Sequence, residues 1–216
     1  MKPFIFILFF WALSIPLLQA QCSGYINLLS QSDVDSFPIN HPGCTDFDGS
    51  IVIGSTSPND IQNLNGLSQL ETISGAFYVE NTQLVDFSEL TNLQLIDGPM
   101  AIRTNNLLTS FNGLQNVESV LKLWVSNCSQ IINFQGLNGL KKIGSNLTIN
   151  NNSLLKNLDG LSGVDTVGYK IHIYDNPKLE NLNAFSSIQG LYQIYLTNNT
   201  SLNDISGLSD IGLEYI

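Results

Sequence analysis

The chain has 216 residues, a formal net charge of −10 and 43% hydrophobic residues. This length fits one or two domains. The acidic balance argues against binding to nucleic acid or to anionic membranes, because both depend on Lys and Arg side chains that neutralise phosphate groups.

The first twenty residues have the pattern of a secretory signal peptide. Lys2 gives a short positive start, residues 4–18 are almost wholly apolar, and Ala20 offers a small residue for cleavage. The competing interpretation is a membrane anchor, but the apolar run is about fifteen residues long and is broken by Pro16, whereas roughly 20 are needed to span a bilayer. We therefore expect residues 1–20 to be a cleaved signal peptide, with no membrane span after it. The mature chain would be secreted, either extracellular or at the cell surface.

Residues 21–48 do not follow the pattern of the rest of the chain and are predicted to form an N-terminal cap. Residues 30–37 can form a short helix because Ser and Asp stand near its start, and Pro38 limits its extent. In an oxidising compartment Cys22 and Cys44 could pair, closing a loop of about 22 residues and stabilising the fold by about 3 kcal/mol. Such a cap would cover the apolar face of the first repeat.

From residue 49 onward one template recurs at intervals of 23 or 24 residues. Each copy has two apolar residues that alternate with polar ones, as in a strand, then an Asn-rich corner, then apolar residues at every third position. A period of 20 to 29 residues is typical of leucine-rich and related solenoids. The marker residues after the corner are Leu67, Leu90, Leu114, Leu137, Leu161, Phe185 and Leu208.

The alternation assigns one pair of inward residues to each predicted strand. One copy alone cannot bury these side chains, so stacked copies should align their strands into a parallel sheet over one shared core. The sequence therefore predicts a mainly β fold, a leucine-rich-like solenoid of about seven coils of 23–24 residues with a disulfide-closed N-terminal cap. The pairs are Ile51 and Ile53, Phe77 and Val79, Met100 and Ile102, Leu123 and Val125, Leu147 and Ile149, Ile171 and Ile173, and Ile194 and Leu196.

A polar column follows the predicted strands, three residues after the second inward residue. A buried Asn at such a corner can bond the backbone of its own and of neighbouring turns. Cys128 falls in this column and is predicted to be a buried free thiol, against the alternative of a reactive or intermolecular cysteine. The column is Asn105, Cys128, Asn152, Asn176 and Asn199, with Asn81 one residue early in its repeat.

The sequence offers little for catalysis or for metal binding. It has two histidines, His41 and His172, it lacks a G-x-S-x-G elbow and a Walker loop, and no Cys or His pair has metal-ligand spacing. A β-helical polysaccharide lyase or hydrolase needs carboxylates gathered on its sheet face. Only Glu80 is a carboxylate among the 21 outward positions, so we expect no enzymatic activity and no cofactor.

The outward face of the predicted sheet carries aromatic and basic residues instead. Aromatic side chains with polar tips are favoured in recognition surfaces. The alternative is that these rings pack on one another and only stiffen an exposed sheet. The candidate binding face consists of Tyr78, Arg103, Trp124, His172, Tyr174 and Tyr195.

These features together resemble the receptor L domain, the leucine-rich-like module of the insulin and epidermal growth factor receptors and of many secreted bacterial proteins. The resemblance rests on the Cys22 to Cys44 segment, CTDFDGSIVIG at 44–54, LETISGAFYVEN at 70–81 and LKKIGSNLTINN at 140–151. The QCSGY that follows the signal is most similar to the bacterial secreted branch. The resemblance covers about residues 22–216 and implies a right-handed parallel β-helix with a binding or adhesive role.

We therefore expect a secreted, non-enzymatic module that recognises an extracellular protein or glycan through its sheet face. One alternative is a structural surface repeat or a fragment of a larger cell-surface protein, and another is a β-helix carbohydrate-active enzyme. Residues 49–216 end inside a repeat, at IGLEYI, so the solenoid is expected to be truncated at its C-terminus.

Overall fold

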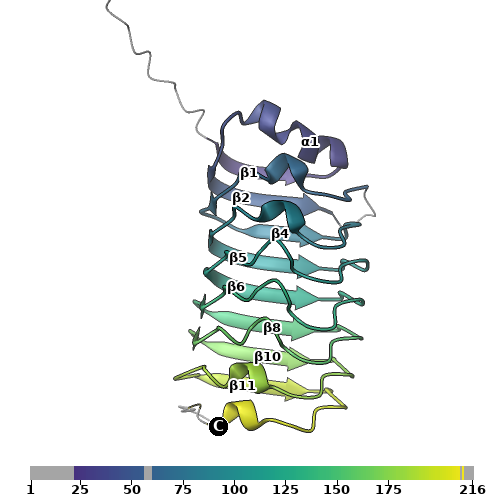
Figure 1. The fold of residues 1–216 in the computed structure, drawn as a ribbon, viewed down its shortest axis with the longest axis vertical. Coiled ribbons are helices and arrows are strands. Elements are labelled where there is room, and N and C mark those ends of the chain that lie inside the picture. The colour runs from purple at the N-terminus through teal and green to yellow at the C-terminus, as the bar shows by residue number, and fades with distance from the viewer. Residues whose placement is uncertain (1–21, 56–59, 210, 212–216) are drawn as a thin grey trace, which may run out of the picture.

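The computed structural model describes residues 22–55, 60–209 and 211, so the predicted signal peptide lies outside the described residues. In this part of the chain the main element is one 11-stranded sheet, with few helices (Figure 1). The strands are β1 (Ser23–Leu28), β2 (Asp46–Gly54), β3 (Thr72–Ile73), β4 (Phe77–Glu80), β5 (Leu95–Arg103), β6 (Ser119–Ser126), β7 (Lys142–Ile143), β8 (Asn146–Asn150), β9 (Thr166–Val167), β10 (Lys170–Tyr174) and β11 (Gln193–Thr197).

Neighbouring strands of the sheet come from successive repeats and pair in parallel. The long path runs β1-β2-β3-β5-β6-β8-β10-β11, and β4 pairs with both β2 and β5. The inward residues stay in register, since Val125 pairs with Ile149 and Ile149 pairs with Ile173. The pairing of β5 with β6 has one register shift, between Ile96 and Pro99. The prediction of a mainly β fold with a parallel sheet is confirmed.

The sheet begins one strand earlier than the sequence indicates. β1 lies inside the segment predicted as a cap, yet Ile26 and Leu28 pair with Ile51 and Ile53 of β2. Comparison of the repeats within the chain missed this strand. An α-helix, α1 (Gln31–Asn40), follows it where the other repeats have an Asn-rich corner and apolar residues at every third position.

Helix α1 lies at the β1 end of the sheet (Figure 1). Ser30 begins it with a capping box, in which its Oγ accepts from the Asp33 N–H at 3.2 Å and its own N–H donates to Asp33 Oδ2 at 2.9 Å. The helix buries Val34 and Phe37. The sequence predicted that the helix would end at Pro38, but the helix continues to Asn40. Pro38 lacks only its own backbone N–H, so the N–H groups of later residues can still form helical hydrogen bonds. The N–H of the C-cap residue closes the last turn on the Phe37 carbonyl at 2.8 Å.

The predicted disulfide is present and ties β1 to the segment before β2. Cys22 and Cys44 are bonded with their Cα atoms 5.8 Å apart, and both side chains are buried. The bond closes the loop that contains α1, so it restricts the unfolded chain where the helix must return to the sheet.

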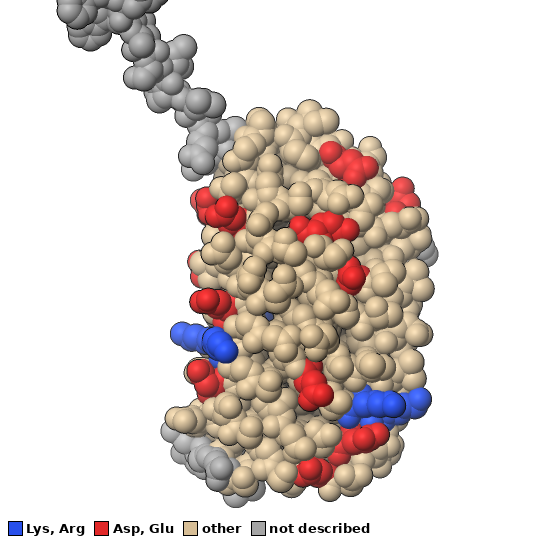
Figure 2. Space-filling model, viewed as in Figure 1, with Lys and Arg blue, Asp and Glu red and all other residues tan. Residues whose placement is uncertain are grey.

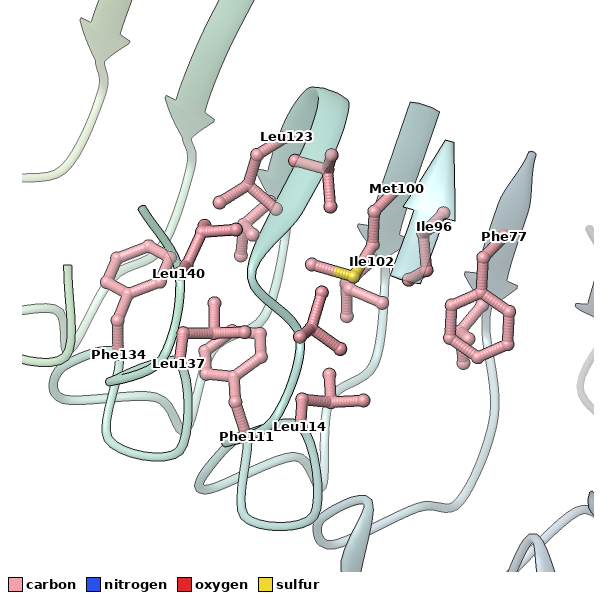
Figure 3. Close-up of a cluster of buried hydrophobic side chains, with 14 of the residues drawn as sticks. Phe77, Ile96, Met100, Ile102, Phe111, Leu114, Leu123, Phe134, Leu137 and Leu140 are labelled. Atoms are coloured by element: carbon pink, nitrogen blue, oxygen red, sulfur yellow. The ribbon is translucent and has the colours of Figure 1, made fainter. Parts of the chain in front are cut away.

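The core lies between the sheet and the turns that lead the chain back to it (Figure 3). Leu123 and Met100 extend from the strands toward Phe111 and Phe134 of the turns, and these two rings stack at 5.2 Å between centroids. The predicted inward residues are fully buried from β2 through β10. In β11 the inward pair is only half-buried, because no further strand covers it among the described residues.

Tight turns account for the three-residue period of the sequence. Asp204 accepts from the Ser206 N–H at 2.9 Å and so shapes the turn before its marker residue. Gly136 precedes another marker with a φ of 107°, and a Cβ there would strike the backbone of Phe111 in the neighbouring repeat. Four of these turns are 3₁₀ helices: η1 (Asn65–Leu67), η2 (Ser88–Leu90), η3 (Asn183–Phe185) and η4 (Ser206–Leu208).

A ladder of buried polar side chains follows the strands at the corner. Asn152 donates to the Val125 carbonyl at 3.2 Å and accepts from the Cys128 N–H at 3.0 Å. Cys128 occupies the equivalent place in its own repeat, with its Sγ 3.7 Å from the Ile102 carbonyl oxygen. These bonds satisfy backbone groups that the sheet leaves unpaired. Asn105, Asn176 and Asn199 donate in the same way to the carbonyls of Val79, Ile149 and Ile173.

Asn81 does not belong to this ladder, so the sequence assignment was wrong at that position. Its φ of 56° matches Asn127 and Asn151, which stand one residue before the ladder position. Thr82 takes the place instead, and its N–H and hydroxyl both donate to Asn105 Oδ1, at 2.9 and 2.7 Å. The assignment failed because a Thr hydroxyl supplies the polar group here that Asn or Cys supplies elsewhere.

Truncation of the inward Leu123 to Ala should lower the free energy of unfolding by about 2–5 kcal/mol, because it removes a fully buried side chain and leaves a cavity. Leu121 of the same strand is 44% exposed, so its truncation should cost less than about 0.5 kcal/mol. Urea unfolding followed by circular dichroism measures both, and equal losses would contradict the assigned faces.

Cys128 should not react with an aromatic disulfide reagent at pH 8 in the folded protein. Its side chain is fully buried, and burial raises the pKa of the thiol to about 12, so the reactive thiolate is scarce. Absorbance of the released thiolate should show no fast reaction in buffer and one thiol per chain in denaturant. Fast labelling of the native protein would identify Cys128 as a reactive cysteine.

Candidate ligand-binding face

The outward middle column of the sheet brings the predicted aromatic residues into one line. Pairing runs from Tyr78 through Ala101 to Trp124, and then through Thr148 to His172. Tyr195 follows in β11. Because adjacent strands lie about 4.8 Å apart, every second member of the column is separated by roughly 10 Å.

Trp124 is held on this face by contacts from both sides. Its Nε1 donates to Asn150 Oδ1 at 3.0 Å, and the guanidinium carbon of Arg103 lies 4.8 Å from the indole centroid. Arg103 in turn bonds Glu80 through Nη2 at 3.1 Å. The indole remains 39% exposed, so these contacts orient the ring without covering it.

A shallow hollow adjoins the indole, and we call it the tryptophan cleft. Its volume is about 310 Å³. Its floor is apolar, since Ala101 is buried beneath the neighbouring side chains, and its basic groups are Arg103 and Lys122. The lining residues are Tyr78, Pro99, Met100, Ala101, Arg103, Lys122 and Trp124.

The other three predicted residues, His172, Tyr174 and Tyr195, form a second group together with Lys170, and we call it the histidine cluster. The His172 ring lies 4.4 Å from the Tyr174 ring and 5.7 Å from the Tyr195 ring. The Lys170 ammonium lies 6.0 Å from the Tyr195 ring centroid. Burial lowers the pKa of His172 from 6.5, and the nearby charge of Lys170 lowers it further.

The structure therefore divides the predicted face into two groups. Thr148 lies between Trp124 and His172 in the column, and its short side chain separates the tryptophan cleft from the histidine cluster. The six predicted residues share one face but do not form one continuous aromatic surface.

Two residues that hold the indole were missed as members of the site. From the sequence, Glu80 is only an isolated carboxylate on the outward face, whereas the structure pairs it with Arg103. Asn150 was assigned an outward position, yet it is almost fully buried beneath the indole to which it is bonded. Register places Glu80 beside Arg103 and Asn150 beside Tyr174. Only the side-chain contacts show that these two residues help to hold the indole.

The described residues contain no group of three or more His, Cys, Asp or Glu side chains placed to hold a metal ion. Within the same ranges no helix is long and apolar enough to cross a membrane. On this face Glu80 is bonded to Arg103, so its carboxylate is engaged in an ion pair.

Replacement of Lys170 by Gln should raise the pKa of His172 toward 6.5, because it removes a neighbouring positive charge while burial persists. The unfolded state binds this proton more readily than the folded state, so protonation of His172 should reduce stability as the pH falls below 6.5. Titration of the His172 ring resonances by NMR measures the pKa of His172 in the original protein and in the variant. Lys178→Gln is the control for loss of one charge, and a pKa equal in both variants would refute the coupling.

Comparison with known proteins gives one match. The family model of the Receptor L domain matches residues 43–137, a span that holds β2 to β6 and the whole tryptophan cleft, whereas the histidine cluster lies beyond it. No curated protein and no solved structure matches the chain. Receptor L domains are extracellular binding domains rather than enzymes. The match therefore supports the similarity of residues 43–137 to an extracellular ligand-binding module.

Proposed function

We propose that this chain is a secreted, non-enzymatic binding module that recognises an extracellular protein through the outward face of its sheet. Trp124 is the centre of the contact. The observation that carries the proposal is the fixed but open indole, held by Asn150 and Arg103 and still 39% exposed. An aromatic anchor that is already ordered loses little conformational freedom on binding, which favours affinity.

The same observation weighs against a purely structural role for these rings. If they served only to stiffen the sheet, they would pack on one another across strands. Tyr78 and Trp124 make no ring contact with each other in the described part of the chain, and a hollow separates them. The histidine cluster does pack on itself, so the tryptophan cleft is the better candidate for the contact.

The architecture that we propose extends the match to the whole described chain. Residues 49–209 would form about seven turns of a right-handed parallel β-helix, with residues 21–48 as the cap and residues 1–20 as a cleaved signal peptide. The parallel pairing of successive strands from β1 to β11, with one register shift between β5 and β6, supports this proposal. The disulfide supports passage through an oxidising compartment and an extracellular location, such as that of the bacterial secreted branch.

Binding of the purified protein to arrays of extracellular proteins and of glycans should yield protein ligands whose affinity depends on Trp124. We expect Trp124→Ala to weaken such a ligand by about 30-fold or more, as for a buried hot-spot aromatic residue. Surface plasmon resonance gives the dissociation constants.

Tyr169→Ala is the matched control, because Tyr169 is a similarly exposed ring, at 45%, that stacks on Tyr192 outside both groups. This variant should bind normally. If ligands tolerate Trp124→Ala but not Tyr169→Ala, the binding site lies outside the candidate face. If only glycans bind, the module recognises carbohydrate rather than protein.

A further inference from the structure

The three outward columns of the sheet have a charge opposite to that of the whole chain. These 21 positions hold Arg103, Lys122 and Lys170 but only one carboxylate, Glu80, although the chain carries a net charge of −10. Exposed carboxylates stand at earlier strand positions outside these columns: Asp46 and Asp48 in β2 and Asp97 in β5. The side of the molecule seen in Figure 2 carries scattered acidic side chains and few basic ones. The basic groups therefore mark a local region where an anionic ligand would be attracted.

Two of these cations are available to a ligand. Glu80 is engaged with Arg103, and in the described ranges neither Lys122 nor Lys170 has an ion pair. They stand in one column with Asn146 between them. Two strand intervals put their Cα atoms about 10 Å apart, a distance that about three residues of extended peptide would span.

The tryptophan cleft lies at one end of this pair. Lys122 is on its rim, while Tyr78, Pro99 and Trp124 offer an apolar surface beside the charge. A volume of about 310 Å³ accepts an aromatic or a large aliphatic side chain. Arg103 and Asn150 hold the indole in place, so the apolar surface exists before a ligand arrives.

We infer that the face selects an acidic protein segment, which places one aromatic or large aliphatic side chain in the tryptophan cleft and sets carboxylates against Lys122 and Lys170. This inference rests on the proposed function and adds the chemical class of the ligand. A protein segment is favoured over an acidic glycan because Trp, Tyr and Arg together are the side chains that dominate protein–protein contacts. The match to an extracellular family that binds protein ligands supports the same choice.

The test uses synthetic peptides and the mature chain expected after cleavage of residues 1–20, in which Trp124 is the sole tryptophan and its fluorescence reports on the cleft. The probes are nine-residue peptides with a central Phe flanked by Glu at varied spacings, the same peptides with Gln in place of Glu, and polygalacturonate. We expect the Glu peptides to change the fluorescence and to bind more weakly as salt rises. The Gln peptides should bind roughly tenfold more weakly.

Combined Lys122→Gln and Lys170→Gln should weaken the Glu peptides by roughly tenfold and leave the Gln peptides unchanged. The matched control is Lys156→Gln with Lys178→Gln, which removes two exposed charges elsewhere and should have little effect. Equal binding of Glu and Gln peptides, or an effect of the control as large as that of the test pair, would overturn the inference. Response to polygalacturonate alone, or to no probe, would also overturn it.

The two proposals fail in different ways. A protein ligand from the arrays that needs Trp124 but tolerates loss of both lysines would leave the binding face standing and remove the acidic ligand class. A ligand that tolerates both Trp124→Ala and loss of the lysines would remove the binding face itself.

Discussion

No repeat of this chain can bury its own apolar residues, and the rest of the structure depends on this constraint. Leu123 and its neighbours are covered because the strands before and after them pair in parallel and in register. Close stacking in turn demands Gly136, where any side chain would strike the adjacent turn. It also demands the polar ladder, because backbone groups at a buried corner need partners that the sheet does not supply. At the N-terminal end the first repeat is covered by β1 and α1, and the disulfide ties this segment together. Helix α1 lies at the β1 end of the sheet (Figure 1).

The same stacking places the candidate site. A parallel register sets residues from distant parts of the chain beside one another on the outward face, so Glu80, Arg103 and Trp124 meet although each is 21 or more residues from the next. The rigid sheet keeps them at a fixed spacing. Contacts on the face then decide which side chains can bind a ligand. The Asn150 side chain accepts a hydrogen bond from the indole, whereas the Lys122 side chain lines the cleft and stays available to a ligand. Binding energy would therefore go into contacts with the ligand rather than into ordering the face.

Much of the fold could be predicted from the repeat, because the 23 or 24-residue spacing assigns one strand and one inward pair to each repeat from β2 onward. The two-residue strands β3, β7 and β9 were not predicted, because they lie in the segment with an apolar residue at every third position. The prediction from the repeat failed where one repeat uses a different residue type or a different element from the others. Thr82 replaces Asn in the ladder with a hydroxyl, and the helix after β1 hides that strand from any comparison of repeats. The outward columns were also predictable, since alternation and register fix them. The burial of these outward positions was not predictable: Ser126 and Asn150 are both covered, and Asn150 is bonded to the indole of Trp124.

By itself the sequence determined the parallel sheet, its inward residues, the place of Cys128 in the ladder and the set of side chains on the outward face. Each of these follows from periodicity, and periodicity is a property of the chain read in order. Only the tertiary structure decided that the face splits at Thr148, that Arg103 is shared between Glu80 and Trp124, and that the cleft keeps Lys122 free beside an apolar floor. These features depend on which rotamers neighbouring strands select together, and spacing along the chain carries no information about that choice.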